Sequence, residues 1–113
     1  MPPNPDQTVG VTFNPQNNPQ FTFDNDPVRM TAAGKVIFNR LGSTGWTFVG
    51  AQVKNAPAGQ FTPSVNPGGQ VMQINDLWTV MGRWQYRITV AVNGQQYTSP
   101  DPEIVNEPPQ AGA

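Results

Sequence analysis

Proline and glycine interrupt this chain so often that no long helix fits into it. The 113 residues include 13 prolines and 11 glycines. No stretch of about 11 to 18 residues keeps the apolar spacing of an amphipathic helix without one of these residues breaking it. The apolar segments between the breaks are rich in Val, Ile, Thr, Phe, Tyr and Trp, which is the composition of β-strands. We therefore expect an all-β protein.

The most regular strand pattern is RWQYRITVAV, at residues 83–92. Its large apolar residues alternate with polar or small ones, which places Trp84 and Tyr86 on one face, where we expect both to be core. The dipeptide Asn93–Gly94 follows and is the strongest short hairpin signal, because both residues accept the positive φ of a type I′ turn. Residues 95–99 should therefore return antiparallel to this strand.

Shorter strand patterns precede this hairpin. We expect strands at residues 7–13, 21–23, 28–32, 35–40, 46–53 and 70–75, with a further short one near Phe61. Gly50 lies inside one of them and indicates a bulge or a close backbone approach. Alternation along the strands indicates one solvated face. The spacing predicts a single antiparallel β-sandwich of about seven or eight strands.

The segment SPDPEIVNEPP, residues 99–109, is predicted to be the last strand rather than a disordered tail. Pro102 cannot donate to a ladder, so pairing should break there and resume at residues 103–106, with Ile104 closing the bottom of the core. A broken final strand after a long penultimate one is typical of immunoglobulin-like sandwiches. We expect the sandwich to span residues 7–109. The segments outside it should be a flexible N-terminal segment at 1–6 and a tail at 110–113.

The C-terminal third carries two resemblances. Asp101–Pro102 and Glu107–Pro108 form a "DP…EP" ending that resembles the DP-EP family of small bacterial proteins, for which no activity is assigned. Residues 74–109 resemble the corner and final hairpin of immunoglobulin-like domains and, more distantly, the C-terminal hairpin of inclusion-body proteins of the PixA/AidA type. The corner positions are Gly82, Trp84 and Tyr86. The resemblance implies a compact immunoglobulin-like β-sandwich of unknown biochemical role and carries over no catalytic residue.

The composition excludes several kinds of chemistry. The chain has no Cys and no His, which excludes disulfides, thiolate or histidine metal sites and catalysis by Ser–His–Asp or Cys–His groups. A net charge of −1 and a pI near 5.0 argue against a nucleic-acid partner. No apolar run is long enough to span a membrane, and the first residues lack the pattern of a secretion signal. We expect a cytoplasmic protein without a cofactor.

Charges of the two signs are separated along the chain. All six basic residues lie between positions 29 and 87, and six of the seven acidic residues lie outside that span. The simpler interpretation is that the terminal segments pair with a mildly basic middle. The alternative is a cationic face for an anionic partner, which six dispersed charges support weakly.

Four carboxylates are candidates for a cation site. If the first hairpin and the final strand met at one end of the molecule, then Asp24, Asp26, Asp101 and Glu103 could converge as oxygen ligands. Their spacing matches no EF-hand loop. Asp before Pro is also an ordinary turn former, and turn chemistry is the interpretation that we favour.

Two tryptophans are candidates for a ligand platform. Trp78 lies in a corner segment on no regular face, and Trp46 begins a strand next to a loop. An exposed indole can stack on a sugar ring, whereas a buried one packs the end of the core. The solvent exposure of Trp46 and Trp78 should decide between these interpretations.

The sequence favours a non-enzymatic interaction or structural module. We expect it to bind a protein partner, or itself as a homo-oligomer, through a sheet face or an edge strand. The alternative is a small-ligand module of the carbohydrate-binding type that uses Trp78 or Trp46 with amide side chains. An enzyme is disfavoured because His and Cys are absent and acidic residues are sparse.

Overall fold

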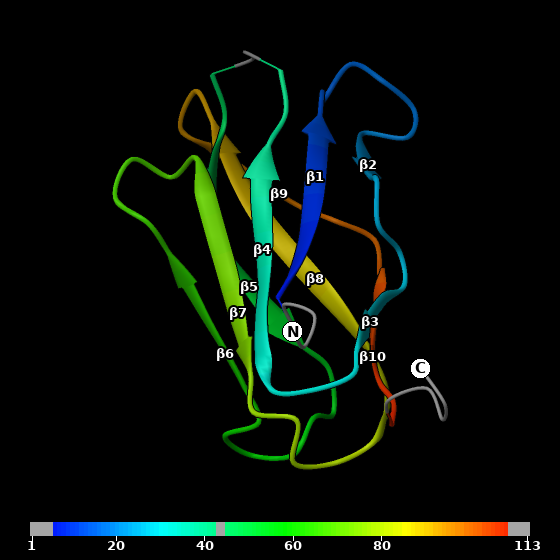
Figure 1. The fold of residues 1–113 in the computed structure, drawn as a ribbon. Coiled ribbons are helices and arrows are strands. Elements are labelled where there is room, and N and C mark those ends of the chain that lie inside the picture. Colours follow the sequence, from blue (N-terminus) through cyan, green and yellow to red (C-terminus); the bar gives the residue numbers. More distant parts are fainter. Residues whose placement is uncertain (1–5, 43–44, 109–113) are drawn as a thin grey trace.

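The computed structural model describes residues 6–42 and 45–108 (Figure 1). Within these residues the chain forms ten strands and no helix, which confirms the all-β prediction. The strands are β1 (Gln7–Phe13), β2 (Phe21–Phe23), β3 (Val28–Met30), β4 (Gly34–Arg40), β5 (Thr47–Val53), β6 (Phe61–Val65), β7 (Val71–Asp76), β8 (Gly82–Val92), β9 (Gln95–Thr98) and β10 (Glu103–Asn106). No helix in the described part of the chain is long and apolar enough to cross a membrane.

The predicted domain limits fall partly on residues outside this description. Residues 1–5 of the predicted flexible segment, residue 109 and the predicted tail 110–113 lie outside the described residues. Asp6 is described, and its Oδ1 accepts a hydrogen bond of 2.8 Å from the backbone N–H of Lys35. The start of the chain's first strand is therefore tied to the start of β4.

The ten strands form two five-stranded sheets. The first has the order β2-β1-β4-β7-β6, and the second has the order β3-β10-β8-β5, with β9 also paired to β8. The sequence patterns marked each of these ten segments, so the predicted total of about seven or eight strands was too low. The prediction of purely antiparallel pairing was also wrong, since β1–β4 and β10–β3 are parallel.

The parallel pairs follow from a change of sheet between β2 and β3. These two strands run in the same direction but belong to different sheets, so residues 24–27 carry the chain from one layer to the other (Figure 1). The next turn reverses the chain, and β4 therefore runs alongside β1 in the same direction. A connection of this kind depends on packing between the layers and leaves no signal in a local sequence pattern.

The predicted hairpin is present and β8 is the central strand of its sheet. Asn93 and Gly94 have φ values of 53° and 77°, as a type I′ turn requires. β8 pairs with β5 along one side and with both β9 and β10 along the other. The irregularity expected at Gly50 lies between Phe48 and Gly50, where the register of β5 on β8 shifts.

The core lies between the two sheets. The rings of Phe38 on β4 and Tyr86 on β8 contact across the layers, with centroids 5.5 Å apart. Tyr86 is fully buried as predicted. Trp84 is only partly buried, because it lies near the end of the sandwich, where its ring contacts Phe61 and covers Gly82.

Removing the hydroxyl of Tyr86 should not weaken the fold. This hydroxyl is buried without a hydrogen-bond partner among the described residues, and burial raises the pKa of the phenol so that it stays neutral. We expect Tyr86→Phe to leave the free energy of unfolding unchanged or to raise it by up to about 1 kcal/mol. Phe38→Ala is the control and should cost about 3–5 kcal/mol. Urea unfolding measures both, and a clear loss of stability for Tyr86→Phe would contradict the assignment.

Candidate functional site

The two candidate tryptophans are structural residues. Trp46 is fully buried and packs edge-on against Phe13 and Phe48, with ring centroids 5.9 and 5.0 Å away. Its position at the start of a strand directs the indole into the core, so the ligand-binding role predicted for Trp46 does not fit the structure. Trp78 is partly buried, and its indole N–H donates to the carbonyl of Met30 at 3.0 Å. That hydrogen bond uses the polar group that an indole would offer to a ligand.

The four candidate cation ligands do not form a common site. Asp24 accepts a hydrogen bond from the backbone N–H of Gly10, and Asp26 accepts one from the N–H of Glu103 at 3.0 Å. Asp101 and Glu103 are used in ion pairs with basic side chains. Among the residues that the structure describes, no group of three or more acidic side chains could hold a metal ion. Asp24 and Asp26 thus shape the connection between the sheets, as turn chemistry predicts.

The terminal acids pair with the basic middle of the chain. Within residues 6–42 and 45–108, four ion pairs join them, namely Arg29–Glu107, Lys54–Asp101, Arg83–Glu103 and Arg87–Asp101. The simpler interpretation of the charge separation is confirmed for the C-terminal acids, whereas Asp24 and Asp26 accept hydrogen bonds from backbone N–H groups. Because the basic members are largely exposed, each isolated pair contributes little to stability.

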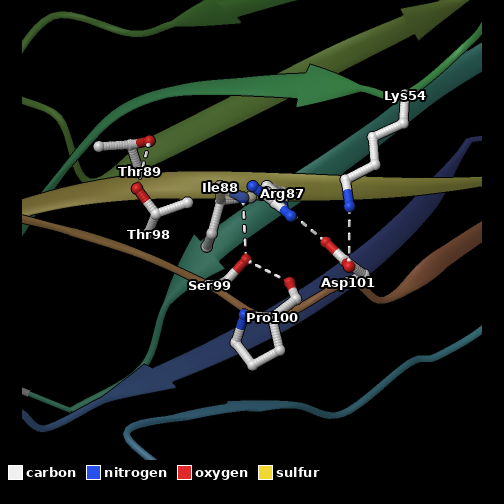
Figure 2. Close-up of polar contacts among 8 residues, drawn as sticks. All are labelled: Lys54, Arg87, Ile88, Thr89, Thr98, Ser99, Pro100 and Asp101. Carbon is white, nitrogen blue, oxygen red and sulfur yellow. Dashed lines mark hydrogen bonds and ion pairs between the residues drawn. The ribbon is translucent and has the colours of Figure 1, made fainter.

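Asp101 joins two of these pairs at the point where the last strand is broken (Figure 2). Its two carboxylate oxygens accept from Lys54 Nζ at 2.9 Å and from Arg87 Nε at 2.8 Å. The hydrogen bonds from Lys54 and then Arg87 hold the pKa of this carboxyl below its ordinary value. Asp101 therefore fixes the connection between β9 and β10 to the outer face of the β5–β8 pair.

One extra residue separates β9 from β10. Thr98 lies opposite Thr89, whereas Glu103 lies opposite Gln85, so five steps along the C-terminal chain match four steps along β8. At this shift the backbone N–H of Ile88 donates to the side-chain oxygen of Ser99 at 2.9 Å (Figure 2). The extra residue is a bulge, and it divides the predicted last strand into two strands with different neighbours.

The side of β9 away from β8 is open. In an antiparallel pair every second residue directs its N–H and C=O toward the partner strand, and the residues between direct theirs outward. The N–H of Ser99 donates to the carbonyl of Ile88 at 2.9 Å, so Tyr97 also faces β8. Gln96 and Thr98 therefore direct their backbone groups outward. No strand in the described part of the chain pairs with this side of β9.

Three of the other edge strands are short or blocked. β2 and β3 have three residues each. On β6, the backbone bonds from Leu77 to Gln60 and from Asn66 to Val71 place Pro63 at an outward-facing position. Proline has no N–H, so this edge lacks a donor where another strand would need one. β9 contains neither proline nor a charged residue. The edge strand β5 also lacks both, but one of its backbone groups is already used, because the N–H of Phe48 donates to the carbonyl of Gly69 at 2.8 Å.

Two shallow hollows border β9. One, of about 470 Å³, lies along the open edge; its lining residues are Asn17, Asn18, Pro19, Gln20, Phe21, Thr98 and Pro100. The other, of about 450 Å³, lies on the outer face of the sheet; its lining residues are Val49, Gly50, Ala51, Gln52, Arg87, Thr89, Gln96 and Thr98. The first lining contains no charged side chain, so an occupant would meet amides, a hydroxyl and the apolar side chains of Pro19, Phe21 and Pro100.

A second exposed feature is the apolar loop, residues 77–81, between β7 and β8. Its members Leu77, Val80 and Met81 are 50%, 43% and 40% exposed. Buried polar side chains hold the loop in place. Gln60 Oε1 accepts from Val80 N–H at 2.7 Å, and Asn106 Nδ2 donates to the Val80 carbonyl at 3.0 Å.

Asp76 is the third member of this buried polar group. Its Oδ1 accepts from the backbone N–H of Trp78 at 2.8 Å and from Asn106 Nδ2 at 3.3 Å. Burial raises the pKa of this carboxyl, and the two hydrogen bonds offset part of that rise. Trp78 has a backbone φ of 59°, which is a strained conformation for a residue other than glycine. The hydrogen bonds of Asp76 maintain this conformation.

Asp76 should make stability depend on pH. Because its carboxyl binds a proton more readily in the folded state, its contribution to the free energy of unfolding falls as the pH rises from below 3.8 through the raised pKa. Asp76→Asn keeps an acceptor oxygen without the charge. We therefore expect the free energy of unfolding of the wild-type chain to fall relative to that of Asp76→Asn as the pH rises through this range. Urea unfolding at several pH values measures the difference.

The matched control is Asp76→Ala, which removes the acceptor altogether. It should cost about 1–3 kcal/mol across the same pH range, because the buried N–H groups of Trp78 and Asn106 lose their partner. A stability difference between the wild-type chain and Asp76→Asn that does not change with pH would contradict the role given to the buried charge.

Sequence reasoning did not single out the open edge of β9. The signal was present in part, because Asn93–Gly94 fixes the register of the hairpin and the absence of proline and charge from residues 95–98 marks an unprotected strand. Which sheet the neighbouring β2 joins could not be read from its three residues. For that reason the unpaired side of β9 emerges only from the fold.

Comparison with known proteins identifies the family. A search of the curated proteins finds no match. The model of the DP-EP family matches residues 5–108, which is nearly the whole chain and includes both the Asp101–Pro102 and the Glu107–Pro108 steps. The resemblance indicated by these two dipeptides is thereby confirmed, and the chain belongs to the DP-EP family.

Proposed function

We propose that this member of the DP-EP family is a non-enzymatic interaction module, and that it binds a protein strand through the open edge of β9. The observation that carries the proposal is the outward-facing backbone of Gln96 and Thr98 on an edge without proline or charge. Exposed strand edges pair readily with other chains, and natural proteins usually protect the edges that must stay free. Strand addition uses main-chain hydrogen bonds, which this edge supplies.

The fold that we propose for the module is an immunoglobulin-like sandwich. Support comes from the two packed sheets, the long β8 with its type I′ hairpin and the broken strand that follows. The passage of the chain from one sheet to the other between β2 and β3 also suits a sandwich whose first segment contributes to both layers.

The contacts of the polar side chains favour binding over catalysis. Asp24 and Asp26 bond to backbone groups, and Asp101 and Glu103 are in ion pairs. Side chains engaged in this way hold the connections of the fold. The burial of Trp46 and the hydrogen bond of the Trp78 indole likewise favour a protein-binding module over the carbohydrate-type alternative.

The proposal is tested by removing one outward N–H from β9. Gln96→Pro deletes the donor at an outward position, as Pro63 does naturally in β6, and leaves the bonds to β8 intact. Gln96→Ala changes the side chain and keeps the N–H. With tagged protein in a lysate of the source organism, we expect a binding partner to be retained by the wild-type chain and Gln96→Ala but lost with Gln96→Pro. Equal retention by all three proteins would overturn the proposal.

A further inference from the structure

The outward-facing backbone N–H and C=O groups of β9 can form hydrogen bonds with the same groups of a second copy of the chain. When two β9 strands approach antiparallel across a two-fold axis, Gln96 of one copy stands opposite the partner's Thr98, and the partner's Gln96 stands opposite Thr98. Gln96 and Thr98 are the residues whose N–H and C=O face outward. Each outward donor therefore finds an outward acceptor, and the pairing closes after two copies.

We propose that two copies of this chain pair through their β9 strands, which would join their β9-containing sheets across the two-fold axis. The inference rests on the proposed function of the β9 edge and names its partner. The edge Gln95–Thr98 has no charged residue, so two copies meet there without repulsion between like charges. The nearby Asp101 is paired with both Lys54 and Arg87, and this group carries one net positive charge outside the four residues of the edge.

Space for an incoming strand is present beside the edge. Gln95, Gln96 and Thr98 are all exposed, and the hollow of about 470 Å³ separates Thr98 and Pro100 from residues 17–21, which form its other wall. The bulge after Thr98 turns the chain toward β10 and ends the free edge at that point. The Asn93–Gly94 turn ends it on the other side, so register in the dimer is limited to a few residues.

The short edge predicts a weak dimer. β9 has four residues, which corresponds to a paired length of roughly 14 Å. Stable protein interfaces bury roughly 1,200 Å² or more, and pairing over so short an edge buries less unless neighbouring surfaces join. We therefore expect monomers in dilute solution and dimers when the protein is concentrated.

Light scattering on size-exclusion fractions tests the inference directly. Samples applied at about 10 µM to about 1 mM cover the range of a weak dimer. The wild-type chain and Gln96→Ala should shift toward twice the monomer mass as the concentration rises, whereas Gln96→Pro should remain monomeric. A wild-type chain that stays monomeric throughout, or a Gln96→Pro variant that dimerises like the wild type, would overturn the inference.

A second variant guards against misfolding of Gln96→Pro. Replacing both Gln96 and Thr98 by Lys keeps every backbone group but places positive charges opposite one another in the dimer. Tryptophan fluorescence of the buried Trp46 reports whether each variant is folded. The double-Lys variant should be a folded monomer, and a folded variant that still dimerises would contradict the interface.

Failure of this inference and failure of the proposed function give different results. A monomeric wild-type chain that still retains another protein through the β9 edge, with loss in Gln96→Pro, removes the self-pairing and leaves the binding function. Dimerisation that Gln96→Pro does not affect, together with partner retention that it does not affect, removes both.

Discussion

The extra residue between β9 and β10 is the constraint on which the arrangement of this molecule depends. Without it, the chain after the hairpin would continue along β8 in one register, from the Asn93–Gly94 turn to Asn106. The shift lets β10 take β3 as a parallel neighbour while β9 keeps an open side. Ser99 makes the shift possible, because its hydroxyl supplies the acceptor for the Ile88 N–H at the point where regular pairing ends.

Side-chain contacts hold the last strand at both of its ends. On the outer face Asp101 binds Lys54 and Arg87, which come from two neighbouring segments of the same sheet. At the opposite end of β10, Asn106 is buried and bonds to Asp76 and to the carbonyl of Val80. The last strand is thus held by a surface ion pair at its start and by buried hydrogen bonds at its end. This explains how a four-residue strand between prolines remains part of the sheet.

The sequence predicted the features that depend on local chemistry. Asn93–Gly94 fixed the hairpin, Gly50 marked the irregularity in β5, and Pro102 marked the break before β10. The remaining features depend on contacts between distant segments. The parallel β1–β4 pair could not be read from the strand segments, because sheet membership is decided by packing. The candidate site also depends on such contacts, since Trp46 is buried in the core and the four acidic residues do not form a common cluster in the described part of the chain. The open edge of β9 can be recognised only when the neighbouring strands are known.

Strand pairing through β9 depends on an alternation along this strand, in which the backbone groups of Gln96 and Thr98 face outward while those of Tyr97 and Ser99 face β8. Residue-resolved amide hydrogen exchange, measured by NMR in dilute monomeric protein, tests this alternation most directly. We expect fast exchange at Gln96 and Thr98 and slow exchange at Tyr97 and Ser99, since only the latter two amides donate within the sheet. Equally slow exchange at all four amides would contradict this expectation, because the edge would then already be occupied within a single chain.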